Sequence, residues 1–289
     1  DLVMTWLAWA LICAFGMAMA DASTKRGLGA LSARQLLIAR CILPLIVLVP
    51  LAIATWPADV PRETWAWLVP SAILEVIAVG FYLRSIQGAD LSQSLPYHAF
   101  TPVLVAGIGG PILGEAVSGT GLAGILLVFA GAWLLNINEF REGWHRPLTA
   151  PLRQRSARLM LLAASIYAFT GVFSRAPLAF LPPTFLGALY FTLVGVTAWV
   201  GLDPRGRVLR TLPWRNVWLW ATVGWMTLMI VTHFVALVGV KTAYMLAVKR
   251  TSLLWGIVLG ALWLGEPDLR RNLLAGGVMV AGVALIALA

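Results

Sequence analysis

Two adjacent basic residues, Lys249 and Arg250, lie inside an apolar run that covers residues 242–263. A charge near the centre of a bilayer costs at least about 2.5–3.5 kcal/mol, so two in succession require a counter-charge or a water-filled cavity. Arginine binds phosphate or carboxylate through paired hydrogen bonds, and lysine adds a compact positive charge. The pair therefore predicts a site for an anionic substrate. The alternative is a structural ion pair with Glu75 or another acid.

Glu75 is an acidic residue in the middle of the apolar run 65–83. A carboxyl group at this depth in a membrane span is a functional candidate. Three roles fit it: it carries a coupling proton, it binds an ammonium group of the substrate, or it pairs permanently with a cation. The third role would use Lys249, Arg250 or Arg40.

Arg40 lies about a turn and a half into the run 35–54. The first interpretation is that its long side chain reaches the lipid headgroups while its stem stays in the apolar layer. The second is that Arg40 lines a cavity, and on this interpretation it is a candidate substrate-binding residue.

His98 follows Tyr97 and lies between Pro96 and Pro102, which are expected to kink or unwind the helix. His98 is a candidate for lining a substrate cavity, with a packed core histidine as the alternative. Tyr97 and Tyr244 are candidate hydroxyl donors to a polar ligand. The sequence contains no zinc-ligand spacing, nucleophile elbow or nucleotide loop, so we expect neither an enzyme nor a metal or cofactor.

The elements that hold these residues follow from composition. Of the 289 residues, 60% are hydrophobic and 11% are charged, against roughly 25% charged in soluble domains. The formal charge of +9 lies mostly in short loops, which is typical of membrane proteins and does not indicate nucleic-acid binding. Apolar runs long enough to span a bilayer lie near residues 2–20, 35–54, 65–83, 91–112, 118–136, 159–178, 183–202, 216–238, 242–263 and 272–289.

The two halves of the chain resemble each other at an offset of 151 residues. Glu115 follows a Leu-Gly pair after the fourth run and Glu266 follows one after the ninth, and Gly131 and Gly282 lie at matching positions beyond them. Both glutamates are read as structural, capping or orienting the following helix. The same offset pairs His98 with Lys249.

We therefore predict an all-α integral membrane protein with ten transmembrane helices in two five-helix repeats. The first repeat covers residues 1–137, a polar linker covers 138–158, and the second repeat covers 159–289. Because five is odd, tandem units have opposite orientations, as in many secondary transporters whose substrates bind near the midplane.

The distribution of basic residues over the loops predicts an orientation in the membrane. Most lie in the loops after the first, third, fifth, seventh and ninth runs, whereas Arg62, Arg175 and Lys241 lie in the others. The positive-inside rule therefore places both termini outside the cell.

The segment from Ser94 to Leu135, with Pro102 and the Leu-Gly-Glu motif, resembles the EamA-type repeat of the drug/metabolite transporter superfamily. Residues 243–285 have the same pattern. The resemblance implies inverted repeats, a central cavity and alternating access without ATP hydrolysis. It also implies cytoplasmic termini, in conflict with the loop charges.

Val248-Lys249-Arg250 is similar to a segment of the plastid triose-phosphate/phosphate translocators, in which the basic pair helps to hold the substrate phosphate. Those relatives carry a lysine in the fourth helix where this chain has His98. The substitution is a departure, because histidine is only partly charged near neutral pH.

The predicted function is secondary active transport or exchange of a small organic anion, with a phosphate or phosphonate group favoured. The alternative is export of amino acids or related neutral or zwitterionic metabolites. The expected partners are the substrate, the lipid bilayer, and protons or a counter-substrate, with the chain acting as a monomer or homodimer. The favoured location is the inner membrane of a bacterium, as a multi-pass protein.

Overall fold

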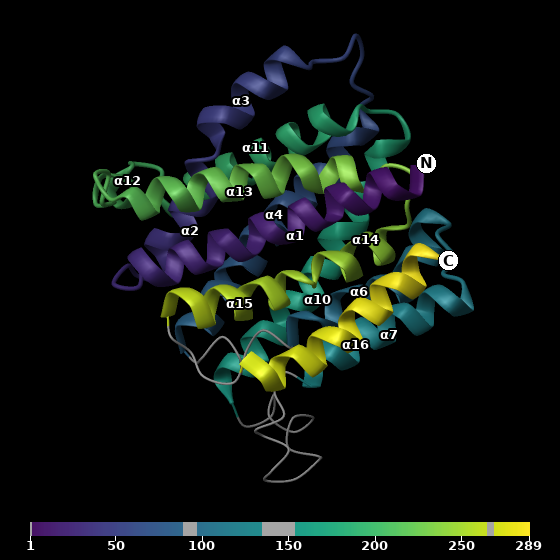
Figure 1. The fold of residues 1–289 in the computed structure, drawn as a ribbon. Coiled ribbons are helices and arrows are strands. Elements are labelled where there is room, and N and C mark those ends of the chain that lie inside the picture. The colour runs from purple at the N-terminus through teal and green to yellow at the C-terminus, as the bar shows by residue number, and fades with distance from the viewer. Residues whose placement is uncertain (1, 89–96, 135–153, 265–268) are drawn as a thin grey trace.

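The computed structural model describes residues 2–88, 97–134, 154–264 and 269–289, and its regular elements are helices (Figure 1). Those before residue 135 are α1 (Leu2–Gly27), α2 (Ala33–Ile42), α3 (Leu45–Ala54), α4 (Glu63–Gly88), α6 (Phe100–Leu113) and α7 (Gly119–Leu134). Those after residue 153 are α10 (Arg155–Arg175), the short 3₁₀ helix η1 (Ala176–Ala179), α11 (Pro183–Leu202), α12 (Arg207–Arg210), α13 (Val217–Ala236), α14 (Thr242–Lys249), α15 (Ser252–Leu264) and α16 (Leu269–Ala287).

Six helical segments of the described chain are long and apolar enough to cross a membrane. They are Thr5–Gly27, Ala33–Ala54, Glu63–Gln87, Arg155–Ala179, Pro183–Leu202 and Val217–Ala236. Shorter apolar helices occupy Phe100–Leu113, Gly119–Leu134 and Leu274–Ala287. Since a helix satisfies its own backbone hydrogen bonds in lipid, this set supports a multi-pass integral membrane protein.

Several helices differ from the apolar runs at their ends or in continuity. Helix α1 continues past Asp21 to Gly27, although the apolar run ends at residue 20. The second run divides at Pro44 into α2 and α3, because proline lacks the N–H that would continue the helix. The ninth run divides between α14 and α15.

The helix bounds repeat along the chain with the offset seen in the sequence. Adding 151 to the bounds of α4, α6 and α7 gives 214–239, 251–264 and 270–285, which overlap α13, α15 and α16. Adding it to α1 gives 153–178, which overlaps α10. The correspondence therefore extends from a short motif to the placement of whole helices.

Packing between the two halves follows the same correspondence. The most extensive contacts pair α1 with α13, α4 with α10, and α7 with α16. The α1–α13 and α4–α10 pairs are equivalent under the offset, and α7 and α16 are equivalent to each other. Each pair joins a helix before residue 135 to one after residue 153, so the halves share one core.

The α7–α16 pair is held at backbone contact by glycines. A Cβ atom built on Gly124 would lie 2.7 Å from the carbonyl oxygen of Gly282, and one built on Gly282 would lie 2.7 Å from that of Gly124. Small residues allow such close crossings in membranes, where dispersion contacts replace the hydrophobic effect. Gly131 faces the same helix, where an added Cβ atom would lie 2.8 Å from the Ala275 carbonyl oxygen.

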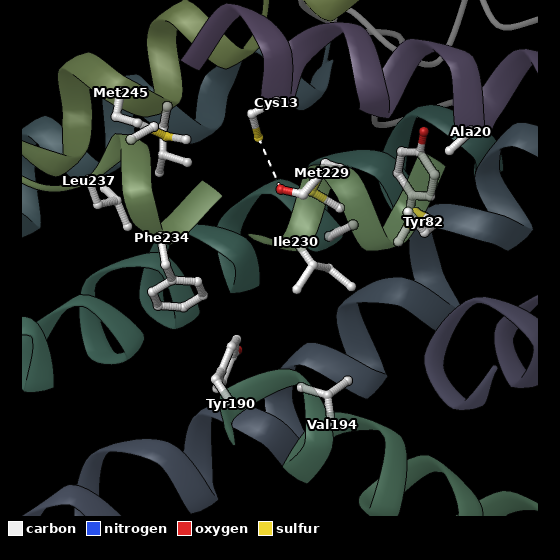
Figure 2. Packing of buried hydrophobic residues seen from close by; sticks show 14 of the residues in the cluster. Cys13, Ala20, Tyr82, Tyr190, Val194, Met229, Ile230, Phe234, Leu237 and Met245 are labelled. Atoms are coloured by element: carbon white, nitrogen blue, oxygen red, sulfur yellow. Dashed lines mark hydrogen bonds between the residues drawn. The ribbon is translucent and has the colours of Figure 1, made fainter. Parts of the chain in front are cut away.

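Helices α1 and α13 pack against each other in the core of the bundle. Cys13 of α1 donates a hydrogen bond from its thiol to the backbone carbonyl of Met229, at 3.4 Å (Figure 2). Figure 2 also shows Tyr82 and Tyr190 on different helices around the α13 segment that carries Met229 and Ile230. Both cysteines, Cys13 and Cys41, are buried free thiols.

The loop between α11 and α13 is ordered by Asp203, which lies outside the apolar spans. Its carboxylate accepts backbone N–H bonds from Val208 at 3.1 Å and Leu209 at 2.8 Å, at the start of α12. Partial desolvation acts to raise the pKa of Asp203, but these N–H groups outweigh it and lower the pKa below its ordinary value. The cap holds α12 and its arginines at the end of α11.

Candidate functional site

A cavity of about 100 Å³ lies at the centre of the bundle. Its wall is formed by side chains from α1, α2, α4, α10, α11, α13 and α14, together with residues next to the start of α6. Its charged and titratable lining residues include Arg40, Glu75, His98, His233, Lys249 and Arg250, with Tyr82, Tyr167 and Tyr190 beside them.

The cavity lies where two helices are interrupted. His98 precedes α6, whose N-cap is Ala99, and Arg250 is the C-cap of α14 just before α15. The interruptions at Ala99 and Arg250 are 151 residues apart. Around Arg250 the chain makes shorter turns: the Thr251 N–H and its hydroxyl both donate to the Val248 carbonyl, at 2.9 and 2.8 Å. Interrupted helices at a midplane cavity are a feature of transporter sites.

The basic pair has neutral partners. A guanidinium nitrogen of Arg250, Nη1, lies 2.8 Å from Nδ1 of His98. The Nζ of Lys249 lies 3.2 Å from Nδ1 of His233 and 3.3 Å from the sulfur of Met229. Among the described residues, no carboxylate pairs with either cation. The predicted alternative of a structural ion pair with Glu75 is therefore not seen.

Glu75 is buried in the cavity wall and accepts hydrogen bonds from two hydroxyls. Thr170 donates to its Oε2 at 2.6 Å, and the Tyr190 hydroxyl donates to the same oxygen at 3.1 Å. In the described part of the chain, none of the three predicted cations pairs with it. Of the three predicted roles, proton carriage and ammonium binding stay open, and the fixed ion pair does not fit.

The position of Arg40 shows that the first interpretation drawn from the sequence, in which its side chain reaches the lipid headgroups, is wrong. Its side chain is buried in the cavity wall instead of reaching the headgroups, and its Nη1 pairs with Oδ1 of Asp21 at 2.8 Å. The Tyr82 hydroxyl donates to the other Asp21 oxygen at 2.8 Å, and the sulfur of Met226 lies 3.2 Å from Arg40 Nη2. Asp21 lies within α1, which stays helical through this residue and ends at Gly27.

Neither predicted tyrosine is among the residues that line the cavity. Tyr97 is buried with its ring edge-on to Trp133 of α7, at 5.6 Å between centroids. The Tyr244 hydroxyl lies at the start of α7, where it accepts from the Ser118 backbone N–H at 3.1 Å and contacts the Ser118 hydroxyl at 3.0 Å. Tyr244 is also five residues from Lys249, so the two do not share a helix face.

Glu115 acts on a different helix from the one expected. Gly114 ends α6 in the left-handed conformation (φ 70°), and the Glu115 carboxylate then accepts the Thr242 backbone N–H at 2.7 Å. Thr242 begins α14, so Glu115 caps a helix of the other half and not the following helix, α7. Its other oxygen lies 3.5 Å from Nε of Arg175. Glu266 lies outside the described residues.

Sequence reasoning missed Thr170 and Tyr190 of the cavity wall, and it ranked Tyr82, Tyr167 and His233 below the chosen candidates, because these residues carry no local motif. It also missed Asp21, the partner of Arg40, which directly follows the first apolar run. The offset of 151 residues could have indicated two of these residues. Tyr82 and His233 are 151 residues apart; Tyr82 contacts His98 and His233 contacts Lys249, and His98 and Lys249 are also 151 residues apart. In the described part of the chain, no group of three or more metal-ligating side chains forms a metal site.

Comparison with known proteins points to a family of membrane transporters. Residues 4–137 match the EamA-like transporter family. Over 137 residues the chain is 27% identical to the "Uncharacterized transporter in cobO 3'region" of Sinorhizobium sp., covering 46% of this chain and 97% of that protein. A solved crystal structure superposes with a TM-score of 0.72 at 14% identity, covering 99% of this chain and 97% of that one, which shows a shared fold.

The EamA-like match covers the first predicted repeat. Together with the six long apolar helices, it supports a drug/metabolite-type membrane transporter and points away from an enzyme. The similarity to plastid translocators is not among these findings.

Proposed function

We propose that this protein is a secondary active transporter or exchanger that moves a small organic anion across the membrane. The observation that carries the proposal is that Lys249 and Arg250 have no acidic partner among the described residues. Both line the central cavity, and their partners among the described residues are the neutral groups of His98, His233 and Met229.

Charge balance is the physical reason for an anionic substrate. Arg40 is compensated by Asp21, whereas Lys249 and Arg250 together exceed the single charge that Glu75 can supply. Burying uncompensated cations is costly, and an anion entering the cavity offsets that cost. The geometry of arginine and the similarity to the translocators' Val-Lys-Arg segment favour a phosphate or phosphonate group.

We infer alternating access between two inverted five-helix repeats, giving ten spans. The repeated helix bounds, the matched contacts of α1 with α13 and α4 with α10, and the paired helix interruptions support this arrangement. The substrate would bind between the repeats, and rocking of one bundle against the other would open the cavity to each side in turn. Protons or a counter-substrate would drive the cycle, in the inner membrane of a bacterium.

The test is uptake of labelled phosphate and phosphate esters into proteoliposomes. Lys249→Ala and Arg250→Ala are expected to reduce uptake at least tenfold, because a charge-assisted hydrogen bond is worth about 1.5–3 kcal/mol. Arg205→Ala, which removes an exposed arginine outside the cavity, is the matched control and should transport normally. Unchanged uptake in both cavity variants would contradict the proposed binding of the anion by Lys249 and Arg250.

A second candidate is export of amino acids or related zwitterions, favoured by one observation. Glu75 is a buried carboxyl group without a basic partner among the described residues, so it is available to an ammonium group. In that case Lys249 and Arg250 would bind the α-carboxylate. Competition separates the two: amino acids should block uptake under this candidate, and phosphate should block it under the first.

A further inference from the structure

Two hydrogen bonds join the turn between α1 and α2 to the loop between α11 and α13, at the end of the bundle that carries α12 (Figure 1). The side-chain amide of Asn216 donates to the Gly27 carbonyl at 3.0 Å. The side-chain amide of Gln35, in the first turn of α2, donates to the Thr211 hydroxyl at 3.1 Å. Parts of the chain that are far apart in the sequence therefore meet outside the central cavity.

An arginine directly precedes each of the four residues that make these bonds. The four are Arg26, Arg34, Arg210 and Arg215. All four side chains are exposed, and we call them the four-arginine surface. The two hydrogen bonds thus bring together guanidinium groups from both halves of the chain.

The four-arginine surface is not balanced by acidic groups of its own loops. The only acidic residue in segments 26–35 and 203–216 is Asp203. Asp203 is buried, and its carboxylate is occupied by the backbone N–H groups at the start of α12. In the part of the chain that the structure describes, none of the four guanidinium groups forms an ion pair. The surface therefore presents uncompensated positive charge.

Tryptophans around these arginines indicate the level of the lipid headgroups. Trp214 and Trp220 are exposed, and the Trp220 indole N–H donates to the Trp214 carbonyl at 2.9 Å. The Cζ atom of Arg26 lies 4.9 Å from the ring centroid of Trp218 and 5.3 Å from that of Trp263. Indole rings concentrate at the membrane–water interface, because they are apolar with one polar edge. The four-arginine surface therefore lies beside the phosphate layer of the membrane.

We propose that the four-arginine surface binds the phosphate groups of anionic phospholipids. A guanidinium group forms paired hydrogen bonds with phosphate oxygens, and basic residues next to a membrane are attracted to its anionic lipids. Bound lipids then bridge the two loops, in addition to the two hydrogen bonds that already join them. The surface lies outside the cavity, so this inference does not depend on the transported substrate.

The experiment measures how phospholipids stabilise the purified full chain in a neutral detergent. Phosphatidylglycerol or phosphatidylcholine is titrated and the melting temperature is recorded, since a ligand that binds the folded state raises it. We expect phosphatidylglycerol to raise the melting temperature at lower concentration than phosphatidylcholine, because only phosphatidylglycerol has a net negative headgroup.

The test variant combines Arg210→Gln with Arg215→Gln. Neither side chain has a partner among the described residues, so the change leaves the known contacts of the fold intact. Each basic residue near an anionic surface strengthens binding about fivefold, so the midpoint of the phosphatidylglycerol titration should rise about 25-fold. The melting temperature in phosphatidylcholine reports that the variant is folded.

Two control variants separate charge from position. Arg210→Lys combined with Arg215→Lys keeps both positive charges and should keep most of the response to phosphatidylglycerol. Arg62→Gln removes an exposed arginine in the loop before α4, outside the four-arginine surface, and should respond as the original protein does.

Equal responses of the original protein to the two lipids, or an unchanged response in the glutamine variant, would overturn the proposal. Inorganic phosphate at constant ionic strength distinguishes a lipid from a soluble anion. It should affect the original protein and the glutamine variant equally. Stabilisation by inorganic phosphate that disappears in the glutamine variant would assign the surface to a soluble anion and overturn the lipid assignment.

Discussion

Cations in the cavity fall into two electrostatic classes. Arg40 is paired with Asp21 at 2.8 Å, and Tyr82 donates to the same carboxylate, so this cluster is complete without a ligand. Lys249 and Arg250 have only neutral partners among the described residues. Removing one partner of the Arg40–Asp21 pair would leave a buried charge uncompensated, whereas Lys249 and Arg250 can still accept an anion.

The Arg40–Asp21 pair predicts an asymmetric response to mutation. Asp21→Asn leaves a buried guanidinium without a counter-charge, which costs about 3 kcal/mol or more, so the melting temperature should fall clearly. Asp21→Asn combined with Arg40→Gln should be more stable than Asp21→Asn alone, because the stranded charge is removed. Thermal unfolding in detergent measures both. A double variant less stable than the single one would show that the uncompensated charge of Arg40 does not cause the loss of stability in Asp21→Asn.

Close helix–helix contacts and interruptions of helices occur at different places in the bundle. Helices α7 and α16 cross at backbone contact through Gly124 and Gly282, which leaves no space for a side chain. The chain is interrupted instead at Ala99 and Arg250, beside the cavity. The crossing supports the bundle at a distance from the site, and the interruptions present polar groups to it.

The crossing predicts a strict requirement for glycine. Gly282→Val would place atoms 2.7 Å or closer to the backbone of α7, so the folded yield and melting temperature should drop sharply. Gly277→Ala on the same helix is the control, since no atom lies within 4 Å of the added Cβ. Alanine is the better helix former by roughly 0.5–1 kcal/mol, so this control should be neutral or stabilised. Equal tolerance of both changes would contradict the close contact.

The whole molecule has two unlike ends. The termini lie at one end and α12 at the other (Figure 1). At the α12 end, Asn216 donates to the Gly27 carbonyl at 3.0 Å and Gln35 to the Thr211 hydroxyl at 3.1 Å, which brings basic loops together. The positive-inside rule predicts that this end faces the cytoplasm, whereas the family resemblance implies the opposite orientation.

Orientation is tested by cysteine labelling in intact cells. The native Cys13 and Cys41 are buried, so they contribute little background. A membrane-impermeant reagent should label Asp59→Cys in the loop before α4 and should not label Arg205→Cys in the loop before α12. Both positions are exposed in the structure. The reverse pattern would place the termini in the cytoplasm, as the family resemblance implies.

The sequence alone determined what depends on composition along the chain. Hydropathy located helices in every apolar run, and the offset of 151 that aligns Glu115 with Glu266 also aligns the helix bounds. A charged or polar group inside an apolar run can be recognised from the sequence, whatever its contacts in the fold. This is why the sequence could single out Lys249, Arg250, His98 and Glu75.

Only the tertiary structure decided which side chains meet. It paired Arg40 with Asp21, turned Tyr97 and Tyr244 away from the cavity, and carried the Glu115 cap to α14. The reason is that partners on different helices depend on crossing angle and rotation, which are set by packing over whole helix surfaces. Hydropathy is a local property of the sequence, and those angles are not.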